Sequence, residues 1–300
     1  MHPVERDFDI PVDMKRLYGD VRILTSIEPP RNYRNVSSLN RVADYIFKEF
    51  SKCCSRVEVQ EYEVRDSTYK NVIASFGPQK TSNKNERIVV GAHYDVCGDQ
   101  PGADDNASGV AAVLEIARLF STLRPHLKRR IDLVAYSLEE PPFFRSQYMG
   151  SAIHAKSLAQ AGIKLHIMIS VDMIGHFSKS GGPSPYFSSL IEPGTVVPGR
   201  TTAILGKKGD EKIAKRIKRY MMETSGELVV AALNFPEGTR GLDHSDHLNY
   251  WNHGYRAVMI SNFPVSSSSN YHQVTDTTAT LDFGKLTEVV RGLYRVLVNL

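Results

Sequence analysis

The sequence predicts an α/β fold with a mostly parallel central sheet flanked by helices. From residue 87 onward, short apolar runs alternate with segments of helical periodicity, which is typical of right-handed βαβ crossovers. The run Arg87–Ala92 (RIVVGA) is apolar without alternation, as expected for a central strand covered on both faces. Hydrophobic residues make up 41% of the 300 residues, which is enough to fill a sizeable core.

The expected elements follow the spacing of the apolar residues. Val42, Ile46 and Phe50 recur at helical spacing and predict a helix over residues 40–50. Residues 56–65 (RVEVQEYEVR) alternate as in a half-exposed strand, and residues 71–76 (NVIASF) resemble a partner strand. The later expected elements are helices at residues 108–120, 149–161, 210–223 and 285–300, and strands at residues 87–92, 131–137, 166–172, 202–205 and 256–261.

Composition and charge exclude several classes of function. With 37 basic and 33 acidic residues, the net charge of +4 over 300 residues is too small to indicate a nucleic-acid-binding surface. No apolar run approaches the roughly 18 residues of a membrane helix. The N-terminal residues lack the apolar core of a secretory signal, and three cysteines cannot build a disulfide framework. We therefore expect a cytoplasmic protein, with a trimmed secreted form as the alternative.

We expect one domain over residues 1–300, because the sequence contains neither an internal repeat nor a low-complexity linker. Residues 178–200 are rich in glycine, proline and serine and predict a long loop insertion. Nothing in the sequence indicates an oligomeric state.

Imidazole and carboxylate side chains follow four of the predicted strands. Ligands of open parallel sheets bind beyond the carboxyl ends of the strands, so we expect these side chains to converge there. This mixture of donors suits zinc, with cobalt or manganese as alternatives, rather than copper or an iron–sulfur cluster. In chain order the candidates are His93, Asp95, Asp104, Asp105, Glu139, Glu140, Asp172 and His272.

The pair Glu139 and Glu140 is chemically informative. Two adjacent carboxylates at one strand end raise each other's pKa unless a cation is present. If one of them binds a metal and the other stays free near metal-bound water, the free one is a general base. The alternative is a solvated acidic turn, which the following Pro141 and Pro142 would favour.

Six segments in order resemble the co-catalytic di-zinc aminopeptidase family, which includes bacterial leucyl aminopeptidases, glutamate carboxypeptidase and glutaminyl cyclase. The resemblance extends from residue 40 to the C-terminus. It implies the three-layer α/β sandwich of zinc exopeptidases and hydrolysis of the N-terminal peptide bond of small peptides. The segments are GAHYD, PGADDNASGVAAVLEIARL, SLEEPPFFRSQYMGS, SVDMIG, SDHLNYWNHGYRAVMI and NYHQVTDTTATLD.

The resemblance also implies two zinc ions per chain, for which Co²⁺ or Mn²⁺ could substitute. His93 and Asp172 would hold one ion, and Glu140 and His272 the other. Asp105 would bridge the two ions.

Further roles are implied for neighbouring residues. Glu139 would be the general base that activates a metal-bridged hydroxide, and Asp95 would orient His93. The peptide bond between Asp105 and Asn106 is expected to be cis. Asp104 remains the alternative bridging ligand, because it is adjacent to Asp105 and identical in type.

Three alternative functions stay open at this point. A glutaminyl-cyclase-like aminoacyl transferase would keep similar residues with one zinc, and a carboxypeptidase or amidase would use the same fold. A non-catalytic binding protein is the third alternative, against which the intact candidate ligands and Glu139 argue.

Other polar residues receive weaker assignments. Ser245–His247 is expected to support the metal ligands and contact substrate, with a purely structural cap as the alternative. Cys97 is expected near the metals as a small buried apolar side chain, with thiolate ligation as the alternative. Asp276 either braces the loop that carries His272 or caps a turn. The rim of the substrate pocket is expected from residues 141–148, 178–200 and 263–270.

Overall fold

The computed structural model describes residues 10–78, 86–177, 201–224, 228–263 and 269–300. The predicted loop insertion at residues 178–200 therefore lies outside the described residues, as do parts of the predicted pocket rim. In the described parts of the chain, every helix is too short or too polar to span a bilayer.

The described strands form an eight-stranded mixed sheet in the order β1-β2-β4-β3-β5-β8-β6-β7. The four central strands β4, β3, β5 and β8 run parallel to one another, whereas β2 and β6 are antiparallel to their central neighbours. The mostly parallel sheet is thus confirmed at its centre. The strands are β1 Val57–Val64, β2 Ser67–Phe76, β3 Arg87–His93, β4 Ile131–Tyr136, β5 Leu165–Val171, β6 Thr201–Lys207, β7 Val229–Phe235 and β8 Ala257–Phe263.

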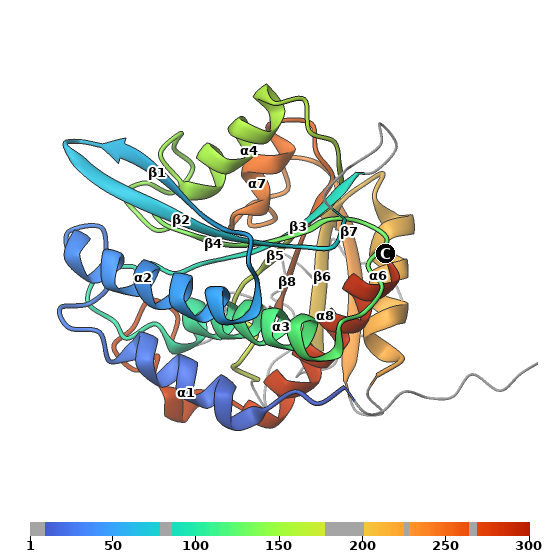
Figure 1. The fold of residues 1–300 in the computed structure, drawn as a ribbon, viewed down its shortest axis with the longest axis horizontal. Coiled ribbons are helices and arrows are strands. Elements are labelled where there is room, and N and C mark those ends of the chain that lie inside the picture. Colours follow the sequence, from blue (N-terminus) through green and yellow to red (C-terminus); the bar gives the residue numbers. More distant parts are fainter. Residues whose placement is uncertain (1–9, 79–85, 178–200, 225–227, 264–268) are drawn as a thin grey trace, which may run out of the picture.

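Helices cover both faces of the sheet, as Figure 1 shows. Helices α1, α2, α3, α6 and α8 lie on one side, and the shorter α4 and α7 lie on the other. The helices are α1 Met14–Thr25, α2 Val36–Cys53, α3 Gly109–Leu123, α4 Gly150–Gln160, α6 Glu211–Met222, α7 His247–Trp251 and α8 Phe283–Asn299. A kinked turn, η1, spans Ala103–Ser108 with non-helical backbone angles at Asp105 and Asn106, and a 3₁₀ turn, η2, spans Thr278–Thr280.

The buried residues of β4 show how the sheet separates two cores. Leu133 and Ala135 belong to the larger core beneath α1, α2, α3 and α8. Val134 and Tyr136 point to the opposite face, where they pack with residues of α4 and α7. This covering of both faces explains why the strand is apolar without alternation.

Each predicted helix and strand is present within a few residues of its expected bounds, but α1, β7 and α7 were not predicted. Helix α1 buries Leu17, Val21 and Leu24 on one face, and the side chain of Asp13 accepts the backbone N–H groups of Lys15 and Arg16 at its N-terminus. Strand β7 is the edge strand beside β6.

Candidate metal centre

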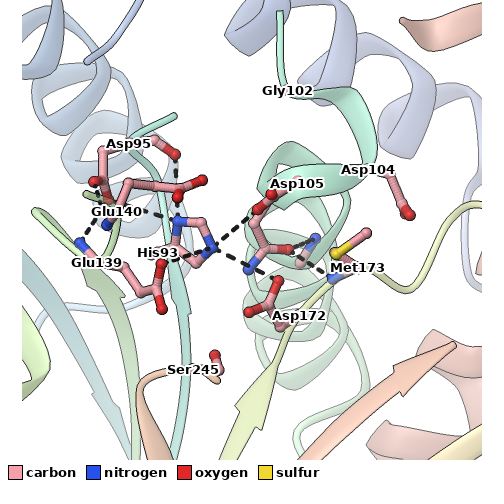
Figure 2. Close-up of polar contacts among 12 residues, drawn as sticks. His93, Asp95, Gly102, Asp104, Asp105, Glu139, Glu140, Asp172, Met173 and Ser245 are labelled. Carbon is pink, nitrogen blue, oxygen red and sulfur yellow. Dashed lines mark hydrogen bonds and ion pairs between the residues drawn. The ribbon is translucent and has the colours of Figure 1, made fainter. Parts of the chain in front are cut away.

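His93 is the last residue of β3, and three carboxylates surround its Nε2 atom. The distances are 3.3 Å to Oδ1 of Asp105, 3.6 Å to Oδ1 of Asp172 and 4.0 Å to Oε2 of Glu139. Asp172 comes directly after β5, the neighbour of β3 in the sheet. Figure 2 shows these side chains converging on the imidazole. The carboxyl ends of adjacent parallel strands thus bring these residues together, as predicted.

Asp105 lies between two histidines. Its Oδ1 faces Nε2 of His93 at 3.3 Å, and its Oδ2 faces Nε2 of His272 at 3.3 Å. The peptide bond between Asp105 and Asn106 is cis, as the family resemblance implied. The side chain of Asn106 donates to the backbone oxygen of Val171 at the end of β5, which ties η1 to the sheet.

Asp104 points away from this cluster, as its label in Figure 2 shows. Its Oδ1 accepts the backbone N–H groups of Gly175 at 2.7 Å and His176 at 3.0 Å. Because this oxygen is engaged by the loop after β5, Asp104 supports the turn and does not join the histidines. Of the two adjacent aspartates, only Asp105 lies between His93 and His272.

Asp276 accepts two backbone N–H groups from η1. Its Oδ1 lies 2.9 Å from the nitrogen of Asp104, and its Oδ2 lies 3.0 Å from that of Asp105. Asp276 therefore ties the loop that carries His272 to the turn that carries Asp105. This contact decides between the two roles that the sequence left open for Asp276.

Glu140 and His272 form the other half of the cluster. Oε2 of Glu140 lies 3.2 Å from Nε2 of His272. Glu140 is buried, whereas 25% of the His272 side chain is exposed, so the cluster opens to solvent on the His272 side.

Asp95 holds both glutamates through their backbone. Its Oδ1 accepts the N–H of Glu139 and its Oδ2 that of Glu140, each at 3.1 Å. Nδ1 of His93 lies 3.3 Å from the backbone oxygen of Asp95 and 3.6 Å from its Oδ1. Because both neighbours are acceptors, they favour a proton on Nδ1, which would leave the lone pair of Nε2 available to a metal ion.

The buried carboxylates destabilise one another's charged forms. Burial raises the pKa of Glu139 well above its usual range, and the charge of Glu140 adds to this effect. Burial and the charge of Asp105 raise the pKa of Glu140 to about 8. Burial lowers the pKa of His93, but the charges of Asp172 and Glu139 outweigh it and raise that pKa well above its usual range. A cluster with this excess of negative charge is stabilised by cations.

The donor atoms also fit metal ions. His93, Asp105 and Asp172 each offer one atom within 4.8 Å of the other two, and His93, Glu139 and Glu140 do the same. Oε1 of Glu140 and Oδ1 of Asp172 are buried and accept no hydrogen bond from the described residues. Unpaired carboxylate oxygens are costly to bury, and a bound cation would remove this cost.

Residues Ser245–His247 lie beneath the cluster and are wholly buried. Ser245 hydrogen bonds to Ser170 of β5, and Nε2 of His247 lies 2.7 Å from the backbone oxygen of Leu242. These contacts join the segment to β5 and to the backbone of Leu242, and the expected support of the metal ligands stays a prediction. The expected contact with substrate is not compatible with this complete burial.

The sequence did not favour a ligand role for two residues near the cluster. Cys97 is half-buried, and its Sγ lies within 4.8 Å of donor atoms of Glu140 and His272. The side chain is less buried than expected, and its role as an apolar side chain rather than a ligand stays a prediction. Arg31 is fully buried and donates to the backbone oxygens of Tyr94 and Gly102, which bound the loop that carries Cys97. Arg31 follows two prolines in the sequence, and no pattern around it predicts this role.

Residues 71–297 match peptidase family M28. The uncharacterized protein YfbL of Escherichia coli is 38% identical over 296 residues, which cover 95% of this chain and 88% of YfbL. A probable zinc metalloprotease of the fungus Pyrenophora tritici-repentis is 28% identical over 237 residues, which cover 73% of this chain and only 52% of the fungal protein.

Solved structures share the fold at low sequence identity. A zinc aminopeptidase from Bacillus subtilis has a TM-score of 0.75 at 13% identity, with 97% of this chain and 95% of that chain covered. A glutaminyl cyclase from Bacteroides thetaiotaomicron has a TM-score of 0.70 at 20% identity, with 96% and 98% covered. Since the family match spans most of the sequence and includes every residue of the cluster, the chain belongs to peptidase family M28.

Proposed function

We propose that this protein is a zinc-dependent exopeptidase that hydrolyses the N-terminal peptide bond of small peptides. The observation that carries the proposal is the position of Asp105, whose two oxygens face two different histidines at equal distance. A carboxylate in this position is suited to bridge two metal ions. Two ions distinguish the proposed hydrolase from a one-zinc cyclase.

His93 and Asp172 would hold one ion, Glu140 and His272 the other, and Asp105 both. Imidazole and carboxylate donors suit zinc, and cobalt or manganese could replace it. The fungal relative is named a probable zinc metalloprotease, which supports zinc. When bound, the metals would polarise the scissile carbonyl and make a nucleophile available from water at neutral pH.

The position of Glu139 supports a role in proton transfer. Its carboxylate lies at the edge of the cluster, 4.0 Å from His93, and its backbone N–H is held by Asp95. Burial raises its pKa, and a nearby cation would lower that pKa again, so that the carboxylate could accept a proton near neutral pH. We infer that Glu139 accepts the proton of the attacking water and delivers it to the nitrogen of the departing amine.

A glutaminyl-cyclase-like transferase is the second candidate, because the Bacteroides thetaiotaomicron cyclase shares the fold. Cyclisation also needs proton transfer to a departing amine, so Glu139 would serve either reaction. A carboxypeptidase or amidase of this fold remains the third candidate.

The decisive experiment is a substrate panel. It contains aminoacyl amides, short peptides with free and acetylated N-termini, and a peptide that begins with glutamine. We expect release of the N-terminal residue from free peptides and none from their acetylated counterparts. Release of the C-terminal residue, or cyclisation of the glutamine without hydrolysis, would contradict the proposal.

We also place the protein in the cytoplasm. Cys53, Cys54 and Cys97 are all free thiols, which suits a reducing compartment.

A further inference from the structure

Cys97 lies beside one half of the candidate metal centre. Its Sγ, a carboxylate oxygen of Glu140 and a ring nitrogen of His272 all lie within 4.8 Å of one another. A thiolate is a strong ligand for zinc and cobalt. The other half of the centre, around His93 and Asp172, contains only nitrogen and oxygen donors in the groups that the described residues form.

The loop that carries Cys97 is held in place from both ends. The guanidinium of Arg31 donates to the backbone oxygen of Tyr94 at 2.8 Å and to that of Gly102 at 2.7 Å. Between these points, Asn32 donates to the backbone oxygen of Gly98 at 2.6 Å, and Val96 donates to that of Arg31 at 3.2 Å. The position of the thiol is therefore set by the fold and does not depend on a free surface loop.

A second observation independently points to a ligand at this position. Glu140 is only 4% exposed, and its Oε1 accepts no hydrogen bond within the described part of the chain. Its other oxygen, Oε2, already faces His272 at 3.2 Å. A buried carboxylate with one unpaired oxygen, a thiol and an imidazole thus offer three donor types within 4.8 Å of one another, which suits zinc or cobalt.

We propose that the Cys97 thiolate is a ligand of the metal ion held by Glu140 and His272. The proposal deepens the proposed function, because it rests on a metal at that position. On binding, the S–H bond breaks, the proton passes to solvent and a metal–sulfur bond forms. The two metal positions are then chemically unequal, and the sulfur-bearing position prefers zinc or cobalt to manganese or magnesium.

The test uses Co²⁺, because a thiolate bound to cobalt gives a charge-transfer absorption band in the near ultraviolet that nitrogen and oxygen ligands do not give. The double variant Cys53→Ser/Cys54→Ser leaves Cys97 as the only thiol, since the chain has three cysteines. We expect the cobalt-loaded double variant to show the band, and Cys97→Ser to lose it while still binding cobalt.

A second readout does not depend on the folding of Cys97→Ser. In the double variant, the rate at which a thiol reagent modifies Cys97 should fall at least tenfold when zinc is added to metal-stripped protein. In Cys97→Ser, the affinity for the zinc ion at Glu140 and His272 should fall. Loss of a residue that only supports a metal ligand costs ~10–100-fold in affinity, and we expect loss of the ligand itself to cost at least as much. The same readouts for Cys53→Ser alone provide a control away from the centre.

The failure of this inference is distinguishable from failure of the proposed function. If the double variant binds two zinc ions and hydrolyses peptides but shows no sulfur band with cobalt, the thiolate proposal is overturned and the exopeptidase stands. If the band appears but no substrate is hydrolysed, the thiolate ligand stands and the exopeptidase fails. If no metal binds at all, both are overturned.

Discussion

Nε2 of His93, the last residue of β3, lies 3.3 Å from Oδ1 of Asp105 in η1. The other oxygen of Asp105 faces His272, which comes from a loop about 170 residues further along the chain. One carboxylate thus connects two groups of donors that the sequence separates widely, and the predictions below follow from this connection.

Glu139 and Glu140 should differ in function although they are adjacent and chemically identical. We expect Glu139→Gln to retain its zinc and to lose turnover by about 10²–10⁴-fold, because the amide cannot accept a proton. Glu140→Gln is the matched control and should lose zinc instead. Zinc content by mass spectrometry and peptide turnover are measured on both variants. If Glu139→Gln loses zinc and Glu140→Gln keeps it, the two roles must be exchanged.

Metal removal should abolish activity reversibly. We expect a strong chelator to remove all turnover and added Zn²⁺ or Co²⁺ to restore it, because the buried carboxylates need a cation to form the active arrangement. Circular dichroism before and after chelation controls for unfolding. Turnover that persists after complete metal removal would refute the metal-dependent account.

Asp95 should act on the metals through the residues that it positions. In Asp95→Asn, an NH₂ group replaces one of the oxygens that accept the backbone N–H groups of Glu139 and Glu140. We expect a loss of about 10–100-fold in zinc affinity, measured by competition with a chromophoric chelator. Glu58→Gln on the exposed surface of β1 is the control for loss of one negative charge. Equal affinity in both variants would mean that Asp95 does not position the ligands.

His154 should make the protein less stable in acid. Burial lowers the pKa of His154 to about 4, below the value near 6.5 expected in the unfolded chain. Between these values the unfolded state binds more protons, so the free energy of unfolding falls as the pH falls from about 6.5 to 4. The contribution is at most about 3 kcal/mol.

The substitution His154→Gln tests this pH dependence. Between about pH 4 and pH 6.5, the slope of the free energy of unfolding against pH should decrease. The decrease should correspond to at most about one proton taken up on unfolding, measured by urea denaturation at fixed metal concentration. His253→Gln, a substitution of an exposed histidine, is measured in parallel as the control. An unchanged slope in His154→Gln would show that His154 does not titrate as the burial argument requires.

The centre of the fold could be predicted because its strands are apolar on both faces and their ends carry metal-binding residue types. Residues such as His93 and Asp172 lie at carboxyl ends of parallel strands, and the rule that ligands bind there brings them together. Strand β7 was missed although most of residues 229–235 are apolar, because periodicity alone does not distinguish a short apolar run in a strand from one in a buried helix. The single-domain organisation stays a prediction.

Side-chain directions were harder to predict than strand ends. The sequence could not separate Asp104 from Asp105 by residue type, and the backbone N–H groups of Gly175 and His176 distinguish them only in three dimensions. The burial of Ser245–His247 and the approach of Cys97 to Glu140 depend on contacts between distant segments. Local periodicity contains no information about such contacts.

The number of zinc ions required for activity tests the central claim most directly. Metal-stripped protein is titrated with Zn²⁺, and peptide turnover is followed against zinc equivalents per chain. The account predicts that full turnover requires two equivalents and that Asp105→Ala binds fewer than two. Full turnover at one equivalent, with no second ion bound at saturation, would contradict it.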